Sequence, residues 1–86
     1  MDEKVAVIGI FIQDTGAVAQ VNGLLHEYAD YIIGRMGLPY KKRGVSIVSI
    51  AIDAPQDIIS ALSGKIGRLQ GVSVKTAYSN VIAYEE

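Results

Sequence analysis

The chain has 86 residues, of which 50% are hydrophobic, with no cysteine and a net charge of -1. This composition predicts one small globular domain at residues 1–86 and excludes a disordered chain, a disulfide framework and a cysteine-based metal site. The near-neutral net charge excludes an overall positive field that would attract the protein to nucleic acid. The longest apolar run is far shorter than the ~20 residues that span a bilayer. The first residues (MDEK) lack the basic start of a signal peptide, so we expect a cytoplasmic protein with no membrane partner.

The first half of the chain predicts a strand, a helix and a second strand. Val5–Ile12 (VAVIGIFI) is rich in β-branched residues and too short for a typical helix, which indicates a buried strand. Apolar residues then recur at helical spacings of three and four, at Val18, Val21, Leu25 and Tyr28. Asp14 or Thr15 is placed to cap this helix, because a short side-chain oxygen accepts from the free N–H groups of the first turn. Tyr31–Leu38 (YIIGRMGL) is expected to form the second strand.

The second half repeats this order after a loop at residues 39–44. Val45–Ile52 (VSIVSIAI) predicts a third strand, and the DAPQD segment after it offers an acid for a helix cap and Pro55 in the first turn. Gly71 is expected to end the second helix, whose apolar stripe consists of Ile58, Ile59, Leu62, Ile66 and Leu69. The alternation in Val72–Tyr78 predicts a fourth strand. The tail at residues 79–86 either extends this strand, returns as a fifth one or reaches a neighbouring subunit.

The resulting order is β-α-β-β-α-β, with a core at about residues 4–78. It predicts an α+β fold, a ferredoxin-like βαββαβ sandwich with two helices on one face of a four-stranded antiparallel sheet. A sheet covered on one face should have strands that alternate between apolar and polar residues. Val5–Ile12 is apolar on both faces instead, and no further element of the chain is left to cover the second face. We therefore expect a homodimer or homotetramer that assembles through the sheet face, and the alternative is a monomer with an exposed apolar face.

The polar residues of the first helix are candidates for binding. Asp14–Gly16 is read in two ways, as an anion site at free backbone N–H groups or as a simple helix cap. His26 with Glu27 and Asp30 is a poor ligand set for a transition metal, so no metal site is predicted. The chain has no phosphate-binding motif of the GxGxxG or GxxxxGK[ST] type.

The remaining polar groups predict no catalysis. Lys41–Arg43 is a basic loop that is either solvated or in contact with phosphate or an acidic partner, and no nucleic-acid-binding motif accompanies it. Ser63 lacks a base, because the single histidine lies on the other helix. Gly64 and Gly67 are expected to mark a close contact with the sheet or a subunit, since glycine inside a helix costs roughly 1 kcal/mol relative to alanine. We predict no enzyme, no catalytic residue and no cofactor.

Three segments, VNGLLHEY, GRMGLP and ALSGKIGRLQGVSVKT, together resemble the iron-only hydrogenase system regulator family of stand-alone ferredoxin-like domains. The similarity covers nearly everything from Lys4 to Thr76, and the tail beyond Tyr78 is not part of it. The resemblance implies a regulatory or accessory role in anaerobic metabolism without specifying a mechanism.

The segment IQDTGAVAQVNGLLHEY is similar to the opening of ACT domains. There an acid, one or two residues and a glycine separate the first strand from the first helix and line an amino-acid site at a subunit interface. The resemblance implies that Asp14, Thr15, Gly16 and Asn22 lie near a small effector, an amino acid or a carboxylate. The chain departs from the pattern at Thr15, where a proline usually precedes the glycine.

Residues 32–76 resemble the C-terminal domain of the nickel-responsive repressor, which forms a tetramer. That repressor holds nickel with histidines and a cysteine, whereas these strands carry neither, and its DNA-binding ribbon has no counterpart here. The resemblance therefore implies oligomeric assembly without a nickel site or direct contact with nucleic acid. We interpret the chain as a non-enzymatic regulatory homo-oligomer that binds a small effector between subunits. The alternative is a structural protein-interaction module with no small ligand.

Overall fold

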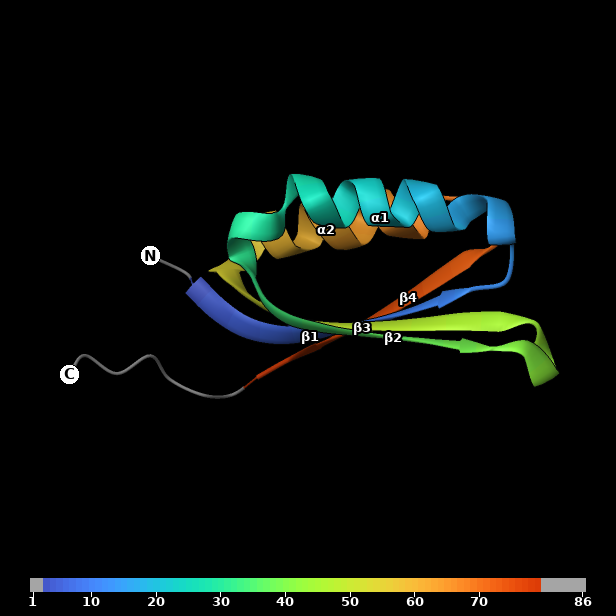
Figure 1. The fold of residues 1–86 in the computed structure, drawn as a ribbon. Coiled ribbons are helices and arrows are strands. Elements are labelled where there is room, and N and C mark those ends of the chain that lie inside the picture. Colours follow the sequence, from blue (N-terminus) through green and yellow to red (C-terminus); the bar gives the residue numbers. More distant parts are fainter. Residues whose placement is uncertain (1–2, 80–86) are drawn as a thin grey trace.

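The computed structural model describes residues 3–79, and its main elements follow the predicted order. They are β1 (Glu3–Ile12), α1 (Val18–Glu27), β2 (Ile32–Tyr40), β3 (Val45–Pro55), α2 (Gln56–Gly67) and β4 (Val72–Tyr78). Short 3-10 turns occupy Thr15–Ala17, Ala29–Tyr31 and Lys41–Arg43. The strands form one antiparallel sheet in the order β2-β3-β1-β4. Both helices lie on the same face of this sheet (Figure 1), which confirms the ferredoxin-like α+β fold.

The core lies between the helices and the even-numbered residues of the two central strands. Ile8 and Ile10 of β1 are fully buried beside Ile50 and Ile52 of β3, because paired residues of antiparallel strands share a face. The helices contribute their buried stripe to this layer: Val21, Leu25, Ile59, Leu62 and Ile66. Each fully buried aliphatic side chain contributes about 1.5–3 kcal/mol relative to exposure. No polar or charged side chain is buried among the described residues, so hydrophobic packing alone forms this core.

The boundaries of β3 and α2 differ from the prediction. Asp53 does not cap α2, since it pairs with Val5 inside the sheet and β3 continues to Pro55. Pro55 precedes the helix instead of lying in its first turn, and the Oδ1 atom of Asp57 accepts a hydrogen bond from the amide of Ile58 (3.0 Å) in that turn. At the other end, α2 stops at Gly67. The amide of Arg68 donates to the carbonyl of Gly64, and the amide of Leu69 donates to the carbonyl of Ile66, which tightens the last turn. The prediction that α2 extends to Gly71 is therefore wrong.

Strand β2 is longer than predicted because it lies at the edge of the sheet. It continues through Pro39 to Tyr40, where the sequence pattern indicated a loop. Proline has no N–H to donate, and an edge strand tolerates this on its unpaired side. The hairpin tip is then only Lys41–Arg43 with Gly44, whose φ of 62° lies in the left-handed region.

The glycines of α2 do not contact the sheet of the same chain. A Cβ at Gly64 would meet only the side chain of Arg68, at 3.6 Å, and a Cβ at Gly67 would meet nothing within 4 Å. The predicted close approach to the sheet is therefore wrong for the residues described. The neighbouring Ser63 connects the layers instead, through a hydrogen bond of 2.7 Å between its hydroxyl and that of Thr76 in β4.

The two helices also make a polar contact at the surface. Lys65 of α2 places its Nζ atom 5.1 Å from the centre of the Tyr28 ring and 4.0 Å from a carboxylate oxygen of Glu27. The hydrogen bond with Tyr28 raises the pKa of Lys65, desolvation opposes this rise, and the charge of Glu27 adds a smaller upward contribution. This exposed contact adds little to stability, because solvent screens it.

The turn between β1 and α1 is held by a cap and by a close backbone contact. The Oδ1 atom of Asp14 accepts a hydrogen bond from the amide of Gly16 (2.9 Å), so the predicted capping role of Asp14 is confirmed for the short turn that precedes α1. The amide of Gln13 donates to the carbonyl of Gly71 (2.8 Å). Gly71 has a φ of 77°, and a Cβ there would lie 2.5 Å from the Cβ of Asp14. Only glycine fits this position.

We expect Gly71→Ala to lower the free energy of unfolding by about 2–3 kcal/mol, because the left-handed conformation and the overlap with Asp14 both penalise a side chain. Denaturant unfolding followed by circular dichroism measures the change. The matched control is Gly23→Ala in α1, where a Cβ meets nothing within 4 Å. It should raise stability by about 0.5–1 kcal/mol. Equal midpoints for Gly71→Ala and the wild type would contradict the close contact.

Candidate binding groove between α1 and β2

Three adjoining hollows follow the side of the molecule where α1 lies over the edge strand β2. Their volumes are about 320, 230 and 220 Å³. The first and second hollows share Asn22 and Arg35, and the second and third share Ile12, Pro39 and Ser46. The shared walls make the hollows one continuous depression, which we name the α1/β2 groove.

The groove is open because β2 has a residue without a side chain beneath α1. Gly37 pairs with Val48, which is buried under the helices, so both residues belong to the helix-facing side of the sheet. A Cβ at Gly37 would meet no atom within 4 Å, which leaves free space in the second hollow. A side chain at this position would therefore begin in free space and extend into the groove.

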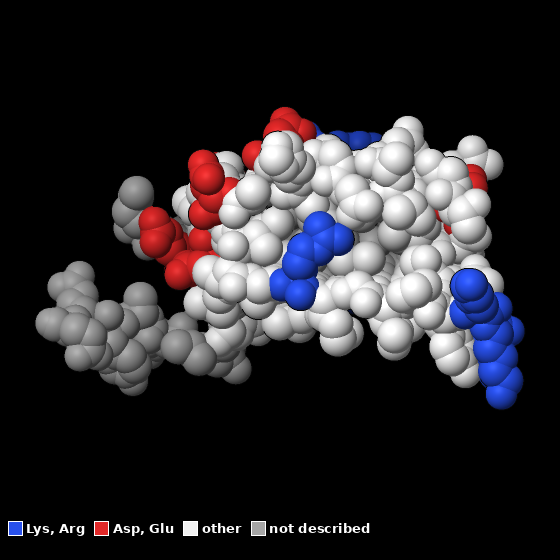
Figure 2. Space-filling view, viewed as in Figure 1, with Lys and Arg blue, Asp and Glu red and all other residues white. Residues whose placement is uncertain are grey.

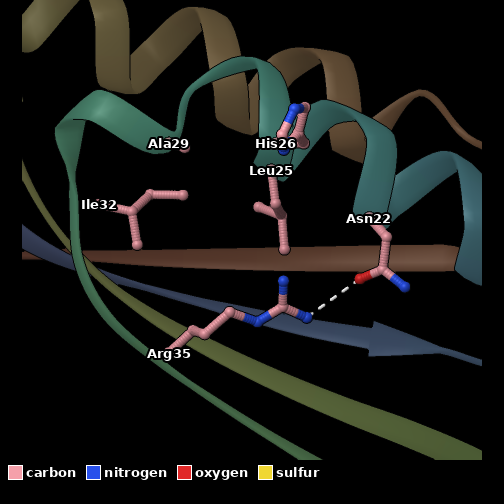
Figure 3. Close-up of a pocket in the computed structure, with 6 residues that line it drawn as sticks. All are labelled: Asn22, Leu25, His26, Ala29, Ile32 and Arg35. Carbon is pink, nitrogen blue, oxygen red and sulfur yellow. Dashed lines mark hydrogen bonds between the residues drawn. The ribbon is translucent and has the colours of Figure 1, made fainter.

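Arg35 supplies the positive charge in the groove. It pairs with Ile50, so it also belongs to the helix-facing side of β2. Figure 3 shows its guanidinium reaching toward α1, where its Nη2 atom donates a hydrogen bond of 3.0 Å to Oδ1 of Asn22. Both side chains are exposed. Within residues 3–79 the only ion pair joins Lys65 and Glu27, so no carboxylate neutralises Arg35. The guanidinium therefore retains donors for an anionic ligand.

The α1 side of the first hollow is formed by Leu25, His26 and Ala29. His26 therefore lies at the groove, but Glu27 points toward Lys65 instead, and neither it nor Asp30 lines any hollow. The described part of the chain contains no group of three or more histidine, cysteine, aspartate or glutamate residues that could hold a metal ion. It also contains no helix that is long and apolar enough to span a membrane.

The site residues predicted from the sequence lie in two places. Thr15 lines the third hollow, and Asn22 lines the first and second. Asp14 and Gly16 line none of the three and form the cap turn beside Thr15. The sequence analysis missed Arg35. The signal was present, since Arg35 is the only charged residue in a predicted strand that contains two glycines.

The charges outside the groove are separated along the molecule. Lys41–Arg43 forms the tip of the β2–β3 hairpin, and Figure 2 shows basic side chains at this end and most of the visible acidic ones toward the opposite end. Between them the visible surface is mainly uncharged (Figure 2). Lys41 is the one basic residue of this tip that lines one of the three hollows, the third.

Comparison with known families agrees with the fold. Residues 4–76 match the model of the TM1266-like family, described as "Iron-only hydrogenase system regulator, putative". The chain belongs to this family. The uncharacterized protein TM1266 from Thermotoga maritima is 34% identical, with a TM-score of 0.85 over 88% of this chain and 96% of that one. This confirms the family resemblance found in the sequence. No functionally curated protein matches the chain significantly.

A more distant structure shows the same fold. The ACT domain of the GTP pyrophosphokinase from Chlorobium tepidum is 22% identical, with a TM-score of 0.68 over 99% of this chain and 96% of that one. Family membership and an ACT-like, ferredoxin-like fold are thus established together. The likeness to the nickel-responsive repressor stays a prediction.

We expect Arg35→Gln to change the free energy of unfolding by less than ~0.5 kcal/mol, because exposed polar contacts contribute little to stability. Chemical denaturation of the variant and the wild type in parallel tests this. A loss of 2 kcal/mol or more, taken as an order-of-magnitude threshold for a structural interaction, would mean that Arg35 mainly supports the fold. The groove would then have no spare cation.

Proposed function

We propose that the protein is a non-enzymatic, cytoplasmic regulator of an iron-only hydrogenase system that works as a homo-oligomer and captures a small effector in the α1/β2 groove. Family membership and the ACT-like fold support the regulatory role. The observation that carries the effector site is the exposed cation of Arg35, unpaired with any described carboxylate, beside the space left by Gly37. Asp14 and Gly16 belong to the site indirectly, because their turn positions Thr15 at the groove and leads into the helix that carries Asn22.

Assembly through the open face of the sheet is supported by the side chains exposed there. Val7 of β1 is 46% exposed, and Met36 and Leu38 of β2 are 55% and 51% exposed. Together with their neighbours they make a broad apolar surface, which consists of Val5, Val7, Phe11, Met36, Leu38 and Tyr40. Contiguous apolar surfaces of this kind mark interaction sites in soluble proteins. A second copy of the same face would cover it, with the β4 edge as a polar rim that includes Ser73 and Lys75.

Strand β2 connects the proposed effector site with the proposed interface. Arg35 and Gly37 face α1 and line the groove, while Met36 between them faces the open side of the sheet. A ligand that favours one position of β2 would therefore favour one arrangement of the subunits. The size of the shift equals the difference in ligand affinity between the two arrangements.

The alternative function is a structural interaction module that binds a maturation enzyme or transcription factor without any small ligand. The exposed apolar sheet face supports this interaction module as much as it supports self-association, because a different protein would cover the same surface equally well. The two functions differ in whether the α1/β2 groove is occupied.

We expect the wild-type protein to be a dimer or tetramer in analytical ultracentrifugation and Val7→Glu to be mainly monomeric. The introduced carboxylate would be buried without a partner in the interface, yet it would remain solvated in the monomer. Gln20→Glu is the matched control, because Gln20 is exposed on α1, away from the sheet. A monomeric wild type at micromolar concentration would contradict the assembly.

We expect a small effector to stabilise the protein in a thermal-unfolding screen of amino acids, small carboxylates, nucleotides and divalent metals. Ligand at ~100 times its dissociation constant adds about 2.7 kcal/mol. In a domain of this size that corresponds to an increase in Tm of more than ~10 °C. The increase should disappear in Gly37→Leu, which fills the groove. A flat screen would favour the interaction module instead.

A further inference from the structure

We infer that the α1/β2 groove takes a carboxylate with a small apolar body and no ammonium group, such as a branched short-chain 2-oxo acid or fatty acid. This inference rests on the proposed effector site and narrows its ligand class. It excludes zwitterionic amino acids as the preferred ligands of the groove.

The cationic side of the groove fits a carboxylate. A guanidinium binds a carboxylate through a planar fork of N–H donors. Asn22 accepts from Nη2 of Arg35 and so restrains the guanidinium from one side, which leaves its other donors for a ligand. Because Oδ1 of Asn22 accepts from Arg35, the amide nitrogen of the same side chain is a further donor near the groove. Lys41 adds a second positive charge at the far end.

The groove offers no comparable site for an ammonium group. No aspartate or glutamate of the described chain lines any of the three hollows. The side-chain carbonyl in the groove, Oδ1 of Asn22, already accepts a hydrogen bond from Arg35. Apart from it, the uncharged oxygen acceptors among the lining side chains are the hydroxyls of Thr15, Tyr40 and Ser46. A desolvated ammonium without an anionic partner is unfavourable, and two nearby cations make it more so.

The walls of the groove fit an aliphatic body. They are lined by apolar side chains on both sides of the Arg35–Asn22 pair, namely Ile12, Val18, Leu25, Ile32 and Val48. Gly37 leaves room between these walls for a branched chain. The volumes of about 320 and 230 Å³ are near the lower end of the range for small-molecule sites.

Three ligands that share one carbon skeleton test the inference. They are 4-methyl-2-oxopentanoate, 4-methylpentanoate and leucine, which differ only in an oxo group, two hydrogens or an ammonium beside the same carboxylate. Isothermal titration of the full-length protein at ~0.15 M salt, where long-range steering is screened, gives each Kd. We expect both acids to bind at least tenfold more tightly than leucine.

Paired variants locate the binding. Arg35→Gln should weaken the acids about tenfold or more, because it removes a charge-assisted hydrogen bond. Arg68→Gln makes the same chemical change at an exposed residue of the α2 end that lines no hollow, and it should leave each Kd unchanged. Gly37→Leu should abolish binding, with retained folding verified by its circular dichroism spectrum and unfolding midpoint.

Each contrary outcome has a separate meaning. Tighter binding of leucine that Gly37→Leu abolishes would overturn the inference and leave the proposed effector site in place. If Arg35→Gln and Arg68→Gln weaken ligand binding equally, the effect of charge is nonspecific, and the inference is overturned. If none of the three ligands binds, the inference is also overturned, and the broad thermal screen decides separately whether the groove holds another effector.

Discussion

The structure depends on the fact that two helices cover only one face of a four-stranded sheet. Strand β1 has neighbours on both sides, and every second residue from Ala6 to Ile12 is buried under the helices. The residues between them face the other way, where no described element of the chain covers them. Because Val5, Val7 and Phe11 are apolar, the monomer leaves apolar surface in water. The same alternation therefore produces both the core and the exposed apolar face.

Glycines set the positions where the sheet and the loops depart from regular packing. Gly71 allows the β4 entry to approach the backbone of Asp14, and this contact holds the turn into α1. Gly37 acts in the opposite way, because its missing side chain leaves a space under α1 that no neighbour fills. A tight contact and an open groove thus both result from the absence of a Cβ. Only the surroundings in the folded chain distinguish the two roles.

The sequence predicted the order of elements and a cap at Asp14 or Thr15, because these features depend on local periodicity and short-range hydrogen bonds. It did not predict which side of β1 faces the helices, because both sides of this strand are apolar. It placed Asp53 and Gly71 at the ends of α2, since an acid and a glycine are common there. Pairing with β1 keeps Asp53 in the sheet, and that long-range contact has no local signal. Arg35 stands out locally as the only charged residue of its predicted strand, but its contact with Asn22, thirteen positions away on another element, has no local signal.

In the proposed effector site, the contact between Asn22 and Arg35 is the interaction that a bound ligand would change. In the described state the guanidinium is held by a neutral amide, which is a weaker acceptor than a carboxylate. A ligand carboxylate at this position would be a stronger acceptor for the guanidinium than the Asn22 amide is. It would bind beside the Arg35–Asn22 hydrogen bond or replace that bond. The two ends of this contact lie on different elements, α1 and the edge strand β2. An edge strand is paired on one side alone, so it is the part of the sheet that such a contact can most readily reposition.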